Sequence, residues 1–159
     1  LYSSAASDVY KRQELFNKSN DVYFLGRSIH HPIALEGALK LKELAYIHAE
    51  GMAAGELKHG TLALVEEGTP AVIINPNDET YQDTISNAIE MKSRGAKIIG
   101  VSSINDSVYD YWIKIPEVDK ILYPILEVIP LQILAYYTAI RRKHNPDYPR
   151  NLAKSVTVK

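Results

Sequence analysis

Short apolar runs alternate with longer helical stretches along most of this chain, and that alternation restricts the folds open to it. Three segments are predicted to form strands, because they are rich in β-branched or aromatic residues and each precedes a Gly, Asn or Ser of the kind that ends a strand. They are Val22–Leu25, Ala71–Ile74 and Lys97–Val101. Tyr111–Ile115 is predicted to form a fourth, shorter strand. Strands separated by helices pair in parallel. The pattern therefore predicts an α/β fold: a three-layer sandwich in which helices flank a parallel sheet.

The segments with helical composition are Ile33–Ile47, Glu56–Val65, Glu79–Arg94 and Tyr123–Arg142. Gly95 suits a left-handed cap after the third helix. Pro124 suits the first turn of the fourth, in which Pro130 predicts a kink. Gly60 lies inside the second helix at a cost of about 1 kcal/mol relative to Ala, which suggests that some other group requires a close approach to the backbone there. Gly51–Gly55 is interpreted as a small-residue break between helices.

With 159 residues the chain can bury one core, so we expect a single domain over residues 14–159. Residues 1–13 are polar, lack periodicity and are excluded from it. The 18 Lys+Arg and 19 Asp+Glu leave a net charge of -1 without basic runs, so neither nucleic acid nor a membrane is an expected partner. The chain has no Cys, and neither a metal nor a cofactor is predicted. We expect a cytoplasmic location, because no secretion signal and no run of roughly 18 apolar residues is evident.

Charged residues form a stripe along the predicted helix 33–47. Glu36, Lys40 and Glu43 are spaced by four and three residues, so they project along one face. The small apolar residues that line another face are Ala34, Ala38, Leu41 and Ala45. A solvated face with weak ion pairs is one interpretation. The other is catalytic, because a carboxylate beside an ammonium can take a proton from one sugar carbon and return it to the next.

Histidines occur at two places that invite a functional interpretation. His59 follows Glu56 by three residues, a spacing found in surface pairs as well as in proton relays. His30 and His31 are adjacent and project differently, so with no third ligand at a fixed offset they do not predict a metal site.

Polar loops follow two of the predicted strands. The loop 26–31 leads into a helix N-terminus, where backbone N–H groups attract anions, but it lacks a phosphate-binding fingerprint. Ser102, Ser103 and Ser107 follow another strand, at the edge where open sheets bind ligands. Such loops are also common without a ligand, so both interpretations stay open.

The C-terminal segment 143–159 contains Pro146 and Pro149, so it is predicted to be an irregular tail. Within it, Lys154 is flanked by small and apolar residues. If these residues pack down, burial would lower the pKa of Lys154, and its amine could attack a sugar carbonyl. A frayed tail without a chemical role is the alternative.

Three longer motifs carry a resemblance to a known family: ALEGALKLKELAYIHAE at 34–50, AAGELKHGTLAL at 53–64 and PRNLAKSVTV at 149–158. In this order they resemble the C-terminal half of the isomerase region of the glutamine–fructose-6-phosphate aminotransferases, from about residue 14 to residue 159. The resemblance implies the sugar isomerase (SIS) fold, a flavodoxin- or Rossmann-like parallel sheet, in agreement with the pattern above. Residues 1–13 match nothing that we recognise.

The resemblance also implies catalytic and binding roles for residues of this chain. Glu43 would shuttle a proton between sugar carbons one and two, with Lys40 as its substrate-binding neighbour. His59 would assist opening of the sugar ring from the adjoining subunit of a homodimer. Lys154 would form a Schiff base with the open-chain keto sugar, and Ala153 would lie beside the ligand.

The implied substrate is fructose-6-phosphate, which reacts with glutamine-derived ammonia to give glucosamine-6-phosphate. The family's first SIS domain, which carries most of the phosphate-binding loops, and its glutaminase domain have no counterpart in these residues. We therefore expect the chain alone to be weakly active or inactive. Two alternatives stay open: a non-catalytic phosphosugar-binding SIS module, and another SIS-fold phosphosugar isomerase or deglycase.

Overall fold

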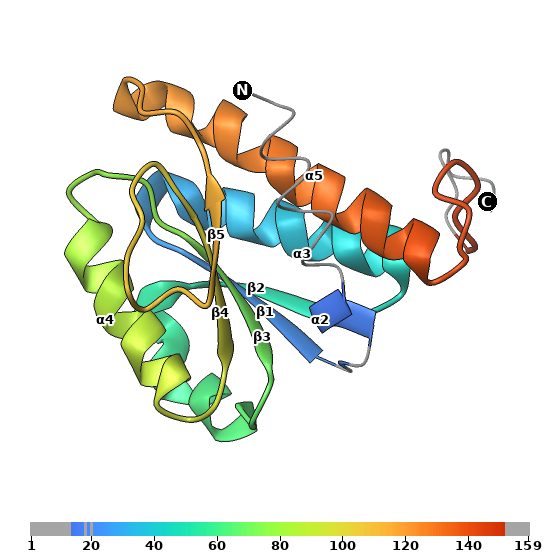
Figure 1. The fold of residues 1–159 in the computed structure, drawn as a ribbon, viewed down its shortest axis with the longest axis horizontal. Coiled ribbons are helices and arrows are strands. Elements are labelled where there is room, and N and C mark those ends of the chain that lie inside the picture. The colour runs from blue at the N-terminus through green and yellow to red at the C-terminus, as the bar shows by residue number, and fades with distance from the viewer. Residues whose placement is uncertain (1–13, 18, 20, 152–159) are drawn as a thin grey trace, which may run out of the picture.

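The structure is a computed structural model that describes residues 14–17, 19 and 21–151 (Figure 1). Within these residues, five parallel strands form one sheet in the order β2-β1-β3-β4-β5. The strands are β1 (Asp21–Gly26), β2 (His48–Ala53), β3 (Pro70–Ile74), β4 (Lys97–Ser102) and β5 (Tyr111–Lys114). This is the strand order of flavodoxin-like folds. The predicted α/β fold with a parallel sheet flanked by helices is confirmed.

Helices cover both faces of the sheet and thereby make three layers (Figure 1). The α-helices are α2 (Glu14–Asn17), α3 (His31–Ala45), α4 (Tyr81–Lys92) and α5 (Tyr123–Arg141). The 3-10 helices are η1 (Ser28–His30), η2 (Ala54–His59), η3 (Thr61–Leu64) and η4 (Lys120–Leu122). Helices α3 and α5 pack side by side on one face of the sheet, and α4 packs with η2 on the other. Residues 143–151 contain neither helix nor strand, as the prolines predicted.

Two apolar cores lie on the two faces of the sheet. Neighbouring residues of one strand point into different cores: Val72 packs with α3 and α5, whereas Ile73 packs with α4 and η2. All five residues of β3 are buried as a result. Burial on both faces explains why the central strands have continuous apolar sequences instead of alternating ones.

Strand β2 was missed by the sequence analysis, which interpreted Gly51–Gly55 as a break. Its residues pair with β1 from Asp21↔His48 to Gly26↔Ala53. The segment His48–Ala53 is poor in β-branched residues and forms an edge of the sheet, so it lacks the usual strand signal. Its glycine instead permits close packing, since a Cβ on Gly51 would lie 2.7 Å from the Ala34 carbonyl oxygen and from Leu35 Cα.

The predicted helix Glu56–Val65 is wrong in type, because the segment forms the 3-10 helices η2 and η3 with Gly60 between them. The expectation of a close approach to the Gly60 backbone is also wrong within the described residues, since a Cβ there would meet nothing within 4 Å. Gly60 has φ +152°, a conformation that glycine adopts at little cost. The glycine therefore serves the turn between two short helices. Gly95, with φ +94°, follows α4 in a left-handed conformation as predicted.

Helix α5 begins beside Pro124, as expected, and continues through Pro130. The span Lys120–Arg141 is long and apolar enough to cross a membrane by length and composition, which the sequence analysis had not anticipated. Burial accounts for part of this apolar character, because α5 covers the sheet and buries Leu131, Leu134 and Ala135 in the core. Only 39% of the apolar window is buried, and Ile125 and Ile140 are 61% and 48% exposed. A carboxylate, Glu127, is also fully buried within it.

Replacing Gly51 by Ala tests the close packing of β2 against α3. The added Cβ would push two backbones apart, so we expect the free energy of unfolding to fall by about 1–3 kcal/mol in urea titrations. Gly55→Ala is the matched control, because a Cβ there would meet only Arg27 side-chain atoms, the nearest at 3.8 Å. Its effect should stay within about 0.5 kcal/mol. Equal effects at the two positions would contradict the packing argument.

Candidate functional site

The charged stripe of α3 lies on the outer side of the helix, away from the core. Lys40 Nζ is 2.6 Å from a Glu43 carboxylate oxygen and 3.7 Å from Glu36. The Lys40 and Glu43 side chains are 28% and 25% exposed, so both reach solvent while staying partly shielded. The predicted apolar face of the helix, Ala34, Ala38, Leu41 and Ala45, is fully or almost fully buried.

The hydrogen bond to Glu43 raises the pKa of Lys40 above its ordinary value, and the nearby Glu36 charge adds to the effect. Lys40 is therefore an ammonium at neutral pH and cannot act there as a nucleophilic amine. Its charge can instead stabilise a carboxylate at Glu43. This arrangement suits Glu43 to accept a proton.

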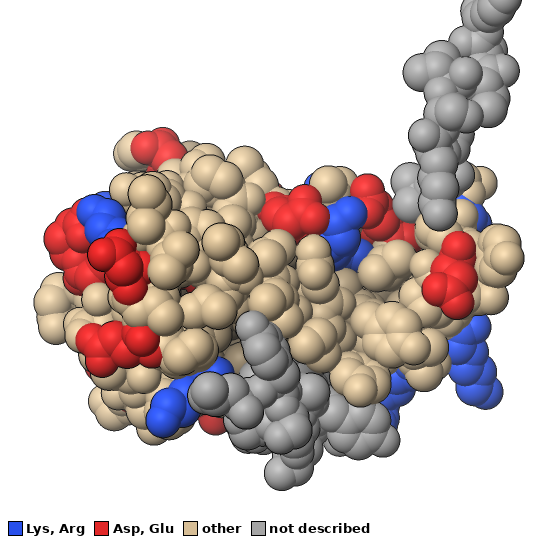
Figure 2. All heavy atoms as spheres, turned by 90° about the horizontal axis from the view of Figure 1, so that it is seen from above, with Lys and Arg blue, Asp and Glu red and all other residues tan. Residues whose placement is uncertain are grey.

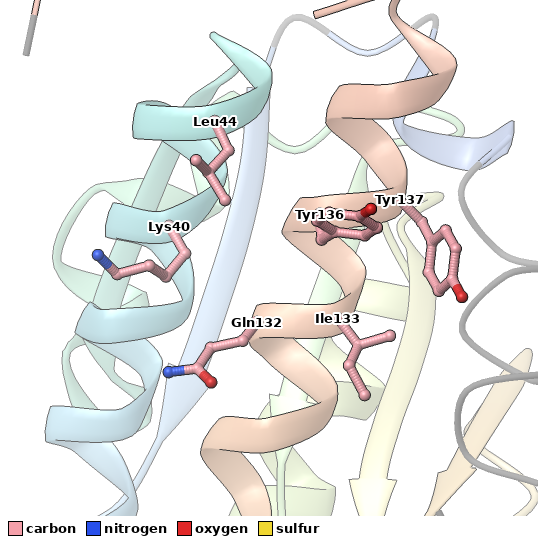
Figure 3. Close-up of a pocket in the computed structure, with 6 residues that line it drawn as sticks. All are labelled: Lys40, Leu44, Gln132, Ile133, Tyr136 and Tyr137. Atoms are coloured by element: carbon pink, nitrogen blue, oxygen red, sulfur yellow. The ribbon is translucent and has the colours of Figure 1, made fainter. Parts of the chain in front are cut away.

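Two hollows flank this pair. One lies between α3 and α5 and is lined by Lys40, Leu44, Gln132, Ile133, Tyr136 and Tyr137 (Figure 3). The other is about 330 Å³ and is lined by Lys42, Glu43, Tyr46, Arg150 and Asn151. Glu43 therefore lies at the edge of a hollow that Arg150 and Asn151 of the C-terminal segment help to form. On the face shown in Figure 2, charged side chains gather in separate patches with uncharged surface between them.

His59 lies on the opposite side of the sheet from Glu43. It ends η2, whose Leu57 is buried in the core beneath α4. The His59 side chain is 72% exposed, and its Nδ1 is 2.7 Å from Glu56. Within one chain, the structure does not bring His59 to the Lys40–Glu43 pair.

Lys154 and Ala153 lie outside the described residues. The last described residue, Asn151, lines the hollow beside Glu43. Lys154 follows three residues later, a span of at most about 11 Å in an extended chain. The described part of the chain therefore ends at the hollow that Glu43 lines.

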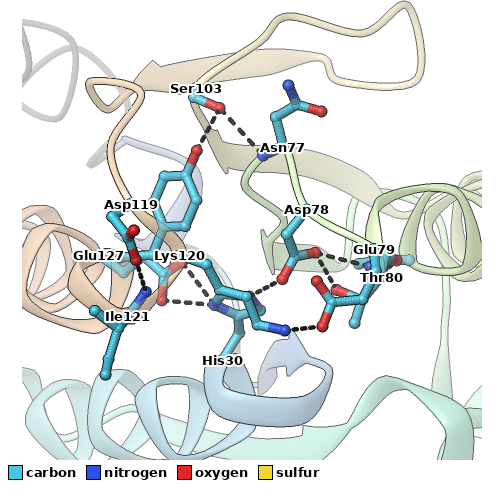
Figure 4. Close-up of polar contacts among 12 residues, drawn as sticks. His30, Asn77, Asp78, Glu79, Thr80, Ser103, Asp119, Lys120, Ile121 and Glu127 are labelled. Atoms are coloured by element: carbon cyan, nitrogen blue, oxygen red, sulfur yellow. Dashed lines mark hydrogen bonds and ion pairs between the residues drawn. The ribbon is translucent and has the colours of Figure 1, made fainter.

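A buried polar cluster, which the sequence analysis did not find, joins His30, Asp78 and Glu127 (Figure 4). His30 Nδ1 lies 2.8 Å and 3.0 Å from the two carboxylate oxygens of Glu127. Its Nε2 lies 2.9 Å from Asp78 Oδ2. The His30 and Glu127 side chains are 0% exposed and that of Asp78 is 3% exposed. The cluster connects η1, the loop after β3, and α5.

Both ring nitrogens of His30 face carboxylates, so an imidazolium satisfies the cluster best. Burial alone would lower the pKa of His30, but hydrogen bonds to Glu127 and Asp78 outweigh it and raise the pKa. For Asp78, burial opposes ionisation, yet hydrogen bonds from His30 and Thr80 lower the pKa. Burial raises the pKa of Glu127 despite its bond to His30.

The cluster occupies the place where open parallel sheets usually bind ligands. The strand order reverses between β1 and β3, and His30 and Asp78 follow the carboxyl ends of these strands. The serine loop beyond β4 is also engaged, because Ser103 Oγ accepts a 3.1 Å hydrogen bond from the Asn77 N–H. Among the described residues, no group of His, Asp and Glu is arranged to hold a metal ion. At this edge, buried side chains of the protein itself therefore bind one another.

Replacing His30 by Gln should strongly destabilise the fold. The change leaves two buried carboxylates without a cation, so we expect the free energy of unfolding at about pH 6 to fall by about 3–5 kcal/mol. His31→Gln is the neighbouring control and should change it by no more than about 0.5 kcal/mol. A loss below 1 kcal/mol for His30→Gln in urea titrations would show that the cluster contributes little.

The charge of His30 can be measured directly by an NMR titration of its ring. Because its pKa is raised, its midpoint should lie above the ordinary value of about 6.5, and Asp78→Asn should lower that midpoint. The proton on His30 then stabilises the folded state fully below about pH 6.5, and this contribution is lost as the pH rises through the raised pKa. A midpoint below the ordinary value in the unchanged protein would contradict the imidazolium.

Comparison with known proteins places this geometry in a family. The SIS domain family matches residues 15–142. Glutamine–fructose-6-phosphate aminotransferases from Thermococcus kodakarensis and Methanosarcina acetivorans are 54% and 52% identical to the chain, each over 91% of it. The chain spans only 24% of the length of either relative.

Solved structures agree with the sequence relatives. The C-terminal domain of glucosamine-fructose-6-phosphate aminotransferase from Francisella tularensis superposes with a TM-score of 0.84 and 37% identity, covering 91% of this chain and 42% of that one. Glucosamine-6-phosphate deaminase from Thermotoga maritima superposes with a TM-score of 0.74 and 27% sequence identity. The match covers 96% of this chain and 46% of that one. The chain belongs to the SIS domain family, and it matches the isomerase region of the glutamine–fructose-6-phosphate aminotransferases with 52–54% sequence identity over 91% of its length.

Proposed function

We propose that this chain supplies the proton-transferring half of a sugar-phosphate isomerase, which makes glucosamine-6-phosphate from fructose-6-phosphate and glutamine-derived ammonia. The observation that carries the proposal is the Lys40–Glu43 pair beside a hollow lined by Asn151. Relatives at 54% and 52% identity are named as aminotransferases of this isomerising type. We assign steps of the reaction that this name describes to residues of this chain.

Glu43 is the proposed base for the isomerisation step. Once ammonia forms the C2 imine of the open-chain sugar, Glu43 takes a proton from C1 and returns one to C2. The C1 hydroxyl loses a proton as C1 becomes an aldehyde, and the C2 nitrogen gains a proton as the imine becomes an amine. The product is therefore an isomer of the imine, and no external oxidant or reductant is needed. Glu43 carries the proton between the two transfers, and the Lys40 ammonium, 2.6 Å away, binds its carboxylate before the first transfer and after the second.

Lys154 is the proposed nucleophile that prepares the sugar. Its neutral amine attacks the C2 carbonyl, water leaves, and a Schiff base forms. Ammonia then displaces the Lys154 amine and leaves the C2 imine on the sugar. The raised pKa of Lys40 argues against that residue in the nucleophilic role, and Ala153 would line the space beside the sugar.

His59 is proposed to act in the site of a neighbouring subunit. Its exposed position across the sheet from Glu43 suits a residue that reaches outward, and it would assist opening of the sugar ring in a homodimer. The same proposal includes a first SIS domain that holds the sugar phosphate and a glutaminase domain that supplies ammonia. Alone, this chain should therefore turn over slowly or not at all.

A chimera provides the direct test. This chain replaces the matching quarter of the Thermococcus kodakarensis aminotransferase, and glucosamine-6-phosphate formation is measured with fructose-6-phosphate and glutamine. Glu43→Gln should lower kcat by about 10²–10⁴-fold, because it removes the base. Exposed Glu66, on the loop before β3, provides the control substitution Glu66→Gln, which should leave kcat unchanged.

The covalent step is tested in the same chimera by adding borohydride with fructose-6-phosphate. Mass spectrometry should find a reduced adduct on the peptide that contains Lys154, and Lys154→Arg should abolish it. Binding of fructose-6-phosphate without an adduct in the unchanged chimera would overturn the catalytic proposal and favour a phosphosugar-binding module.

A further inference from the structure

Helix α5 is apolar on two opposite sides. One side packs in the core, whereas the other, which we call the outer face of α5, points away from it. Its members are spaced by four, three, four and four residues: Ile125, Ile129, Gln132, Tyr136 and Ile140. Within the described helix, Glu127 is the only charged residue before Arg141, and it is buried. A helix that is apolar all round is typical of an element covered on both sides.

A groove adjoins the outer face of α5 and extends the apolar surface. It has a volume of about 460 Å³, and Leu44, Ile133 and Tyr137 contribute to its lining (Figure 3). Other strongly exposed apolar side chains of the described residues lie mainly on α3 and η4, in the same layer as α5. Scattered apolar residues are normal on a protein surface, but a continuous apolar surface of this kind marks an interaction site.

Opposite charges lie at the two ends of the outer face of α5. Before the helix, Glu117 and Asp119 are exposed, and the neighbouring Lys120 is already paired with Glu79. At its end, three consecutive residues, 141–143, are basic. Figure 2 looks onto this side of the molecule and shows uncharged surface between charged side chains at left and right. An antiparallel helix with the same pattern would therefore place its acidic end beside the basic end of this one.

We propose that the outer face of α5 and the adjoining groove dock a second copy of this chain, with the two α5 helices antiparallel about a two-fold axis. The inference stands on α5 and does not rest on the proposed function. The contact also differs from the one through which His59 would reach a neighbouring subunit, because His59 lies on the other side of the sheet. A net charge of -1 leaves little repulsion to oppose the pairing.

The spacing of the outer face fits such a pairing. In a two-fold contact, each pair of residues that meets once meets again with the copies exchanged. Ile125 and Tyr136 are equally distant in sequence from a midpoint between residues 130 and 131, and so are Ile129 and Gln132. Ile125 of one copy would therefore lie against Tyr136 of the other, at the groove, and the two Gln132 side chains would lie near the axis.

A lipid surface suits this face less well than a second copy does. The helix cannot enter a bilayer while Leu131 and Leu134 stay in the core. Helices that lie on membranes typically carry Lys and Arg beside their apolar face. Here the charged residues of α3 near the groove are Glu36, Lys40 and Glu43, two of which are acidic.

Cross-linking tests the arrangement directly. Because the chain has no Cys, Gln132→Cys creates a single reactive site, which a short bismaleimide should join to the same site of a second copy. Ile89→Cys is the matched control, since Ile89 is 53% exposed but lies on α4, across the sheet. Equal yields of cross-linked product at the two positions would overturn the proposal.

Sedimentation of the chain measures the association itself. The unchanged chain should show at least twice the mass of one chain, and Ile125→Glu should raise the dissociation constant at least about tenfold, because it buries two unpaired charges. Leu64→Glu is the control, since Leu64 is 62% exposed on η3 and its replacement should leave the mass unchanged. Thermal melting should show that both variants stay folded.

Two outcomes of that experiment would overturn the proposal. One is an unchanged chain that stays monomeric up to about 100 μM, which would point to another domain as the cover of this face. The other is a chain that sediments with phosphatidylcholine vesicles in place of pairing.

The antiparallel direction has its own test. Glu117→Lys should weaken the pairing, because it places a positive charge beside the basic end of the second copy. Adding Lys143→Glu in the same chain should restore part of the loss. A further loss in the double variant would contradict the antiparallel arrangement. These measurements use no sugar phosphate, so their failure would leave the proposed function untouched.

Discussion

Burial of the sheet on both faces is the constraint on which the rest of this structure depends. It forces α3 to lie flat on β1 and β2, where a bare glycine at position 51 allows direct backbone contact. The apolar side of α3 then faces inward, and Lys40 and Glu43 can only face outward. In the proposed function, the rigid helix keeps the Glu43 carboxylate in a fixed position, which suits a repeated proton transfer between two carbons.

The proposed site lies away from the edge of the sheet where the strand order reverses. Parallel sheets commonly bind ligands where the strand order reverses, but His30, Asp78 and Glu127 occupy that place and bind one another, which leaves Glu127 Oε1 without a hydrogen bond. The outer face of α3 remains available, and in the proposed function a second domain and a neighbouring subunit complete it. His59, on the other side of the sheet, then contributes to a different copy of the site from the one that contains its own Glu43.

The sequence predicted the elements whose local signals agree with their packing. The strands among them have apolar runs, and the helices have helical composition with caps or prolines near their ends. These elements are β1, β3, β4, α3, α4 and α5. β2 lacked such signals, because an edge strand next to a helix backbone needs small residues. The buried role of His30 could not be predicted, since its partners lie 48 and 97 residues away. The stripe with Glu43 was visible from spacing, whereas the exposure of Ile125 and Ile140 depends on how α5 packs against the sheet.

A crystal structure of the borohydride-trapped chimera would test the central claim most directly. The account predicts continuous electron density from the Lys154 amine to C2 of the sugar, with the Glu43 carboxylate beside C1 and C2 and Lys40 still bonded to it. Density for the sugar on another lysine, or a sugar out of reach of Glu43, would contradict the assignment of both residues.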